Sequence, residues 1–167
     1  GEDVWGLNEF FHNDIDELVN AFTSAQKEIA SDMELRLQIG LSRHCPISYL
    51  EDCLSLFWGN KNFYSIDLYG DELAQPIENF KGIYRRAKKE GLRLKAHVGE
   101  WGTAKDVRTA VEELELDEVQ HGIAAVSDES VIRFLADNKI RLNITPTSNI
   151  LLGRVADMSM HPIGKLY

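Results

Sequence analysis

The chain has 167 residues with 18 basic and 27 acidic side chains, a formal net charge of −9, and 44% of its residues are hydrophobic. This length and apolar content suit one globular domain with its own core and exclude a disordered chain. The acidic balance argues against a nucleic-acid binder, which needs a basic stripe, and no apolar run approaches the ~18 residues of a membrane span.

Helices and strands are predicted to alternate in the first half of the chain. Apolar residues at helical spacing predict a helix over about 14–30, and alternating residues predict a strand over 35–41. A helix beginning at Pro46 and ending near Gly59 follows, and then a strand over 63–68. The next helix, over 76–91, presents the densest basic cluster as a solvated face: Arg85, Arg86, Lys88 and Lys89.

The alternation continues to the end of the chain. Strands are predicted over 92–97, 118–120 and 140–144, with a helix over 104–114 between the first two. Ser127 is the predicted N-cap of a helix that runs to about 138. Five strands separated by four helices in strict alternation imply parallel strands with right-handed crossovers. We therefore predict one α/β domain over residues 1–167, with its strands in sequence order.

Polar residues follow three neighbouring strands where each one ends. They are Asp67 and Gly70, then His97 and Glu100, then His121. The carboxyl ends of parallel strands share one face, so these residues are expected to converge there. Two histidines and a glutamate at one mouth can position a metal-bound water. Taken singly, each has an ordinary alternative as a hydrogen-bonded histidine, a solvated glutamate, an N-cap aspartate or a turn glycine.

The remaining histidines carry weaker signals. His12 and His161 lie in polar or terminal stretches, and a surface position is predicted for both. His44 lies just past a strand end and is placed at the border of the pocket. Its neighbour Cys45 does not complete a recognised zinc-ligand spacing.

Cysteine usage and the first residues indicate the cellular compartment. Cys45 and Cys53 lack the Cys-x-x-Cys spacing of a redox or zinc motif, so we expect both to be reduced and partly buried. The opening Gly1-Glu2-Asp3 does not match the basic start of a secretory signal. These features favour a cytoplasmic protein.

Four segments at successive strand ends form an ordered series. They are Ser-Ile-Asp-Leu-Tyr-Gly-Asp-Glu at 65–72, His-Val-Gly-Glu at 97–100, His121-Gly122, and Thr-Pro-Thr-Ser-Asn at 145–149. The series strongly resembles the adenosine/adenine deaminase family of the metal-dependent amidohydrolase superfamily. The resemblance covers about residues 30–167 and implies an incomplete (β/α)8 TIM barrel made of strands three to seven.

The resemblance also implies an activity and a role for each site residue. It implies zinc-dependent hydrolytic deamination of adenosine, a small-molecule purine nucleoside, to inosine and ammonia. His97 matches the zinc-ligating histidine of the fifth strand, and Glu100 matches the acid that protonates the purine at N1. His121 matches the histidine that orients the zinc-bound hydroxide. Gly70 matches the glycine whose backbone meets the purine, and Asp67 lies in the same substrate-binding motif.

Two elements of the family pattern are absent from the sequence. It contains neither the family's His-x-His pair nor its Asp-Asp pair. One histidine cannot hold zinc, which needs three or four protein ligands. We therefore expect the chain to be part of a longer enzyme with one Zn²⁺ per full-length subunit, and to be inactive alone.

Other functions stay open at this point. Adenine or another aminopurine is an alternative substrate, and a metal-free or degenerate α/β binding module is an alternative class. A cytidine-deaminase type of zinc enzyme is disfavoured because its Pro-Cys-x-x-Cys motif is absent.

Overall fold

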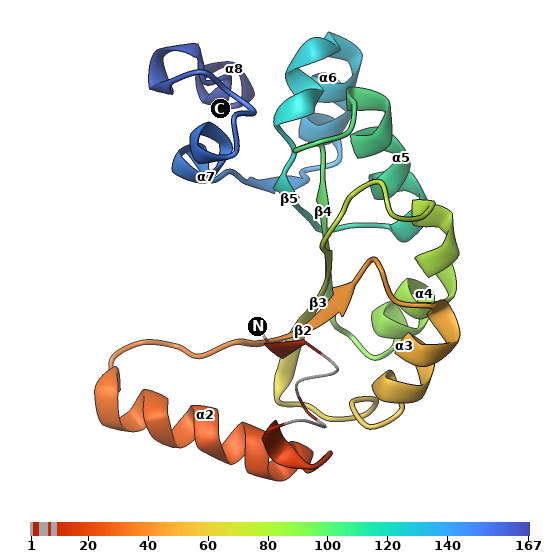
Figure 1. Ribbon diagram of the computed structural model, residues 1–167, viewed down its shortest axis with the longest axis vertical. Helices are drawn as coiled ribbons and strands as arrows, with labels where there is room; N and C mark the ends of the chain where they lie inside the picture. The colour runs from red at the N-terminus through yellow and green to blue at the C-terminus, as the bar shows by residue number, and fades with distance from the viewer. Residues whose placement is uncertain (1, 4–6, 8–9) are drawn as a thin grey trace.

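The computed structural model describes residues 2–3, 7 and 10–167, and its centre is a parallel sheet (Figure 1). The described strands pair in the order β1-β2-β3-β4-β5-β6, all parallel. The five predicted strands are therefore confirmed in direction and order, and β1 adds a short strand before them. The bounds are β1 (Glu2–Asp3), β2 (Leu37–Ser42), β3 (Phe63–Tyr69), β4 (Arg93–Val98), β5 (Glu118–His121) and β6 (Arg141–Asn143).

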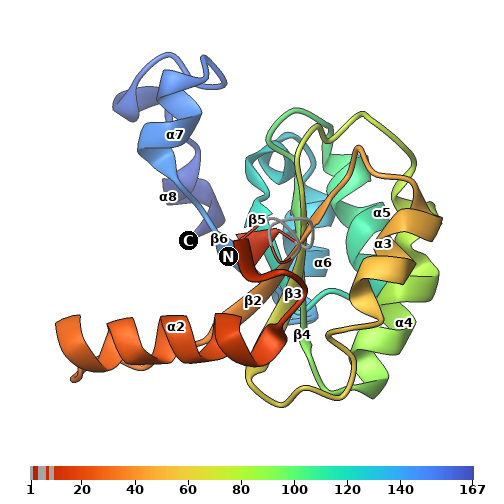
Figure 2. The ribbon, with the colours of Figure 1, turned by 60° about the horizontal axis from the view of Figure 1, so that its bottom comes forward.

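Helices α3, α4, α5 and α6 cover one side of the curved sheet, and α2 and the α7–α8 segment lie at its two ends (Figures 1 and 2). Strands β2 to β5 each lead into a helix on this outer side, in sequence order, which makes the structure part of a (β/α)8 barrel. Among the described residues, no helix is long and apolar enough to cross a membrane. The α-helices are α2 (Ile15–Ile29), α3 (Ile47–Leu54), α4 (Lys81–Lys89), α5 (Ala104–Leu114), α6 (Glu129–Asp137), α7 (Pro146–Leu151) and α8 (Ile163–Leu166).

Short 3₁₀ helices account for the main differences from the predicted boundaries. The helix expected over 76–91 begins as η1 (Ile77–Phe80) before α4, and η3 (Met158–Met160) links α7 to α8. Ser127 is not the N-cap of α6, because it ends η2 (Ile123–Ser127) and its hydroxyl donates to the carbonyl of Ala124 at 2.8 Å. Asp128 takes the cap instead, its carboxylate accepting the Ser130 N–H at 2.8 Å.

The two faces of the strands differ in chemistry because successive side chains alternate between them. On β3, Ile66 and Leu68 are fully buried in the core shared with the helices. Ser65 and Asp67 point to the other face, where Gln38 of β2 bonds both of them. A polar layer therefore lies below the carboxyl ends of the strands.

A charged cluster occupies the opposite, amino-terminal end of the same face. The carboxylate of Glu118 accepts a hydrogen bond from Asn143 Nδ2 at 2.9 Å and lies 3.4 to 3.7 Å from Arg93, Lys95 and Arg141. Burial raises the pKa of Glu118, but the Asn143 amide and the cations outweigh it, so the pKa lies below its ordinary value. Polar groups at this end of a barrel serve stability.

Candidate active site

His97 and His121 meet at the carboxyl ends of β4 and β5. The strands pair with Val98 opposite His121, which places the two imidazole rings 5.3 Å apart, centroid to centroid. Glu100 comes from the loop after β4, and its Oε1 lies 3.2 Å from His121 Nδ1. The structure thus brings together three of the residues that the strand-end pattern selected.

Asp67 lies behind His97 on the neighbouring strand. Its Oδ1 is 3.3 Å from His97 Nδ1, and its Oδ2 accepts hydrogen bonds from Gln38 Nε2 at 3.1 Å and Gln120 Nε2 at 3.5 Å. Burial lowers the pKa of His97, but the Asp67 carboxylate raises it more, and the net shift is upward. Asp67 thereby orients the ring through Nδ1 and leaves Nε2 for another partner.

His121 lies among polar neighbours in an unusual backbone conformation. Its Nδ1 is 3.1 Å from Thr145 Oγ1 and 3.3 Å from Asn149 Nδ2. Burial is the largest influence on its pKa and lowers it, which favours the neutral imidazole. Its φ of 67° is left-handed, and Gly122 after it has a φ of 68°. A non-glycine residue held in this region often marks a functional site.

Glu72 fixes the loop that carries Glu100. Its carboxylate accepts the backbone N–H of Gly99, that of Glu100 at 3.1 Å and that of Trp101 at 2.8 Å. Glu72 is only 5% exposed, so the carboxylate replaces water as the partner of these donors. Sequence reasoning did not give Glu72 a role; its signals were an acidic residue shortly after a strand end and its place in the segment over 65–72.

Gly70 lies where the backbone passes His44. Its φ is +95°, and a Cβ at this position would approach His44 Nδ1 to 3.1 Å. Glycine therefore serves both the turn and the close approach, and leaves the Gly70 backbone exposed. His44 is exposed at the same edge, where it was predicted.

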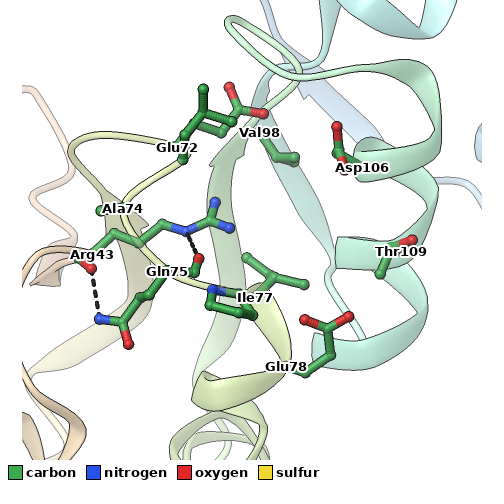
Figure 3. A pocket seen from close by; sticks show the side chains of 11 residues that line it. Arg43, Glu72, Ala74, Gln75, Ile77, Glu78, Val98, Asp106 and Thr109 are labelled. Carbon is green, nitrogen blue, oxygen red and sulfur yellow. Dashed lines mark hydrogen bonds between the residues drawn. The ribbon is translucent and has the colours of Figure 1, made fainter.

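A cavity of about 340 Å³ lies beside the segment that carries Glu72 (Figure 3). Its walls are the segment after β2, the segment after β3 and helix α5. Arg43 Nε donates to the Gln75 carbonyl at 2.9 Å, and Gln75 Nε2 donates back to the Arg43 carbonyl at 2.7 Å. Glu72 and Asp106 line the same cavity. The reciprocal pair braces the segment that carries His44 against the segment that carries Gly70 and Glu72.

One histidine prediction is wrong. His161 is 8% exposed rather than on the surface, because its imidazole packs against Asn149, which is itself fully buried. His12 is exposed as predicted. Asn149 was noted only as part of a strand-end segment, and its partners come from distant parts of the chain.

The described residues do not complete a metal centre. No group of three or more His, Cys, Asp or Glu side chains within residues 2–3, 7 and 10–167 is arranged to hold an ion. His97, with a carboxylate on Nδ1, has the environment of a single ligating imidazole. Cys45 and Cys53 are partly buried, and neither forms a disulfide within the described residues.

Comparisons with known proteins agree on one family. The sequence profile of the adenosine deaminase family matches residues 10–167. A relative from Treponema pallidum (strain Nichols), named as an adenosine/adenine deaminase, is 38% identical over 161 residues, covering 96% of this chain and 54% of its own length.

Solved structures agree with this family. The adenine deaminase of Arthrobacter aurescens superposes with a TM-score of 0.76 at 26% identity, covering 88% of this chain and 45% of the other. An amidohydrolase from Burkholderia ambifaria with bound zinc gives 0.74 at 25% identity, covering 87% and 42%. The chain spans about half the length of the curated relatives it matches.

Proposed function

The chain belongs to the adenosine deaminase family, and on that premise we propose that the whole protein hydrolyses adenosine to inosine and ammonia. The observation that carries the proposal is the meeting of Glu100, His121 and His97 at the carboxyl ends of neighbouring strands. A carboxyl group beside a neutral imidazole supplies an acid and a base to one substrate.

Glu100 is the proposed acid. Its carboxyl group is the group proposed to pass a proton to N1 of the purine ring, which makes C6 more electrophilic toward water. The three N–H bonds to Glu72 keep its loop in place. His121, neutral and in contact with Glu100, orients the attacking water by hydrogen bonding. The exposed backbone of Gly70 is the proposed contact for the purine, and contact with Asp67 stays a further prediction.

A zinc ion is the proposed cofactor, with His97 as one of its ligands and Asp67 as the group that orients His97. Zinc in such a site lowers the pKa of a bound water toward ~7. We propose that the other ligands lie outside the described residues, which hold no group of three or more His, Cys, Asp or Glu side chains arranged around an ion. The zinc in the Burkholderia ambifaria amidohydrolase supports this assignment.

Adenine is the second candidate substrate. The names of the Treponema pallidum relative and of the Arthrobacter aurescens structure both include adenine. A metal-free binding module is the alternative outside the enzyme class. Two cysteines that form no disulfide within the described residues, together with a small nucleoside substrate, support our proposal that the protein acts in the cytoplasm.

The test is a turnover assay on the purified whole protein supplied with Zn²⁺. Ammonia release is measured with adenosine, adenine and guanosine, and zinc content is determined in parallel. Inosine formation is the expected result. Formation of hypoxanthine from adenine, without formation of inosine from adenosine, would identify adenine as the substrate instead. Purine binding without zinc and without ammonia would favour the binding module.

A further inference from the structure

Asn149 and His161 form a hydrogen-bonded chain that ends on the proposed acid. The Ile163 backbone N–H donates to His161 Nδ1 at 3.1 Å, and His161 Nε2 lies 3.2 Å from Asn149 Oδ1. Asn149 Nδ2 donates to Glu100 Oε1 at 2.9 Å. We propose that Asn149 and His161 are positioning residues for Glu100, an inference that rests on the proposed function.

The direction of every bond in this chain follows from its first donor. A backbone N–H can only donate, so His161 Nδ1 must be its unprotonated acceptor. In a neutral imidazole the proton then lies on Nε2, and Nε2 donates to Asn149 Oδ1. This leaves only the Nδ2 amino group of Asn149 to face Glu100 and His121. His161 thus determines which end of the amide is presented to the acid.

The arrangement gives the two oxygens of Glu100 different surroundings. Oε1 lies 2.9 Å from Asn149 Nδ2 and 3.2 Å from His121 Nδ1. Within the part of the chain that the structure describes, no hydrogen bond reaches Oε2 from a side chain or the backbone. Oε2 is therefore the oxygen available to carry a proton toward a substrate, while Asn149 holds Oε1 on the protein side.

Burial makes this chain of bonds a defined structure rather than a transient contact. Asn149 is 0% exposed and His161 is 8% exposed. A buried amide that loses its partner costs free energy, so each link holds the next one in place. The Arg154 guanidinium adds a second tie, because its Nε donates to the Glu100 carbonyl at 2.8 Å. The segment after β6 therefore acts as the support of the loop that carries Glu100.

The kinetic test compares the full-length, zinc-loaded enzyme with variants at Asn149 and His161. At His161, an apolar substitution is paired with one that keeps a hydrogen-bond donor. Asn149→Ala removes the donor to Glu100 and is expected to lower kcat by about 10- to 100-fold, part of the ~10²–10⁴ carried by one acid–base group. KM and zinc content are expected to stay within about threefold of wild type. His161→Leu should lower kcat similarly, and His161→Gln should restore most of it, since a glutamine amide can donate to Asn149 Oδ1.

Val155→Ala controls for general loosening, because Val155 lies in the same segment and its apolar side chain cannot join the chain of bonds. It is expected to keep kcat near wild type. Equal losses of kcat in Val155→Ala, His161→Gln and His161→Leu would overturn the positioning role. Retention of full kcat in Asn149→Ala would also overturn it.

A second measurement separates this inference from the proposed function. Nitrogen-15 NMR of histidine-labelled full-length protein near pH 7 reports the tautomer of His161, which is expected to be protonated on Nε2 alone. A proton on Nδ1 would overturn the chain of bonds whether or not the enzyme is active. Absence of purine turnover in the wild type would instead defeat the proposed function, and the nitrogen shifts would still decide the geometry.

Discussion

The carboxylate of Asp67 lies 3.3 Å from His97 Nδ1 across two adjacent parallel strands. Asp67 is almost fully buried, and two glutamine amides occupy its second oxygen. A carboxylate tied down in this way sets the orientation of the imidazole. The relationship places Asp67 behind the proposed metal ligand, on the protein side of the site.

Asp67→Asn is therefore expected to weaken zinc binding without unfolding the protein. Partners that orient a ligating histidine typically contribute 10- to 100-fold to metal affinity, and a loss of about that size is expected. The zinc dissociation constant of the full-length protein measures it. Asp52→Asn, at an exposed carboxylate on α3, is the control. An affinity within twofold of wild type for Asp67→Asn would remove Asp67 from this role.

Glu72→Gln is expected to impair turnover while zinc stays bound. In wild type, three backbone N–H groups donate to the two carboxylate oxygens of Glu72. The glutamine amide has only one acceptor oxygen, so the loop over residues 99–101 loses part of its anchorage. Small misplacements of catalytic groups cost about 10²-fold in rate, and a fall in kcat of about 10- to 100-fold is expected. Glu78→Gln is the control, because its exposed carboxylate lines the same cavity away from the loop (Figure 3). Equal kcat values for the two variants would contradict the anchoring role.

Gly70→Ala is expected to destabilise the protein more than Gly59→Ala. Both glycines have positive φ values, +95° and +82°, so both variants carry the left-handed cost of about 1–2 kcal/mol. Only at Gly70 does the added methyl group meet the His44 imidazole, whereas Gly59 faces open space. Denaturant unfolding measures the difference, and KM for the purine should rise in Gly70→Ala alone. Identical effects of the two changes would show that His44 does not restrict this position.

Much of the fold could be predicted because hydrophobic spacing repeats regularly along the chain. Strands β2 to β6 fall where alternation or apolar runs placed them, and the helices between them make the strands parallel. The two residues of β1 are too few to show a period. Helices α7 and α8 are short, and no helix was predicted after the strand over 140–144.

Residues of the candidate site could be predicted only where they lie at the end of a strand. His97, Glu100 and His121 stand at or just past strand ends, and parallel strands bring such ends together. Glu72 and Asn149 act through partners 28 and 49 residues away, at Glu100. Nothing in their local sequence identifies those partners. His161 was misjudged for the same reason, since its burial depends on Asn149.

Glu118 provides a prediction about stability and pH. Its pKa is lowered in the folded protein, so its ionised form stabilises the fold. This stabilisation is fully present above the unfolded pKa of about 4.3, and it is lost as pH falls through the lower pKa of the folded state. Glu118→Gln should therefore reduce the free energy of unfolding at pH 7 by about 1 kcal/mol, a modest figure because Arg93 and Arg141 are partly exposed.

The difference between Glu118→Gln and wild type should shrink toward zero near pH 3. Urea unfolding at both pH values measures it, with Glu112→Gln, an exposed partner of Arg108, as the control. A difference that is the same at pH 7 and pH 3 would show that the charge of Glu118 is not what stabilises the fold.

Glu100 is expected to deliver a proton to the purine and not to bind the metal. The most direct test is the rate of adenosine deamination by full-length Glu100→Gln beside the zinc content of the same sample. We expect one zinc per subunit, as in wild type, and a rate lower by about 10²–10⁴-fold, because the amide cannot supply the proton. Loss of zinc, or a rate close to that of wild type, would contradict it.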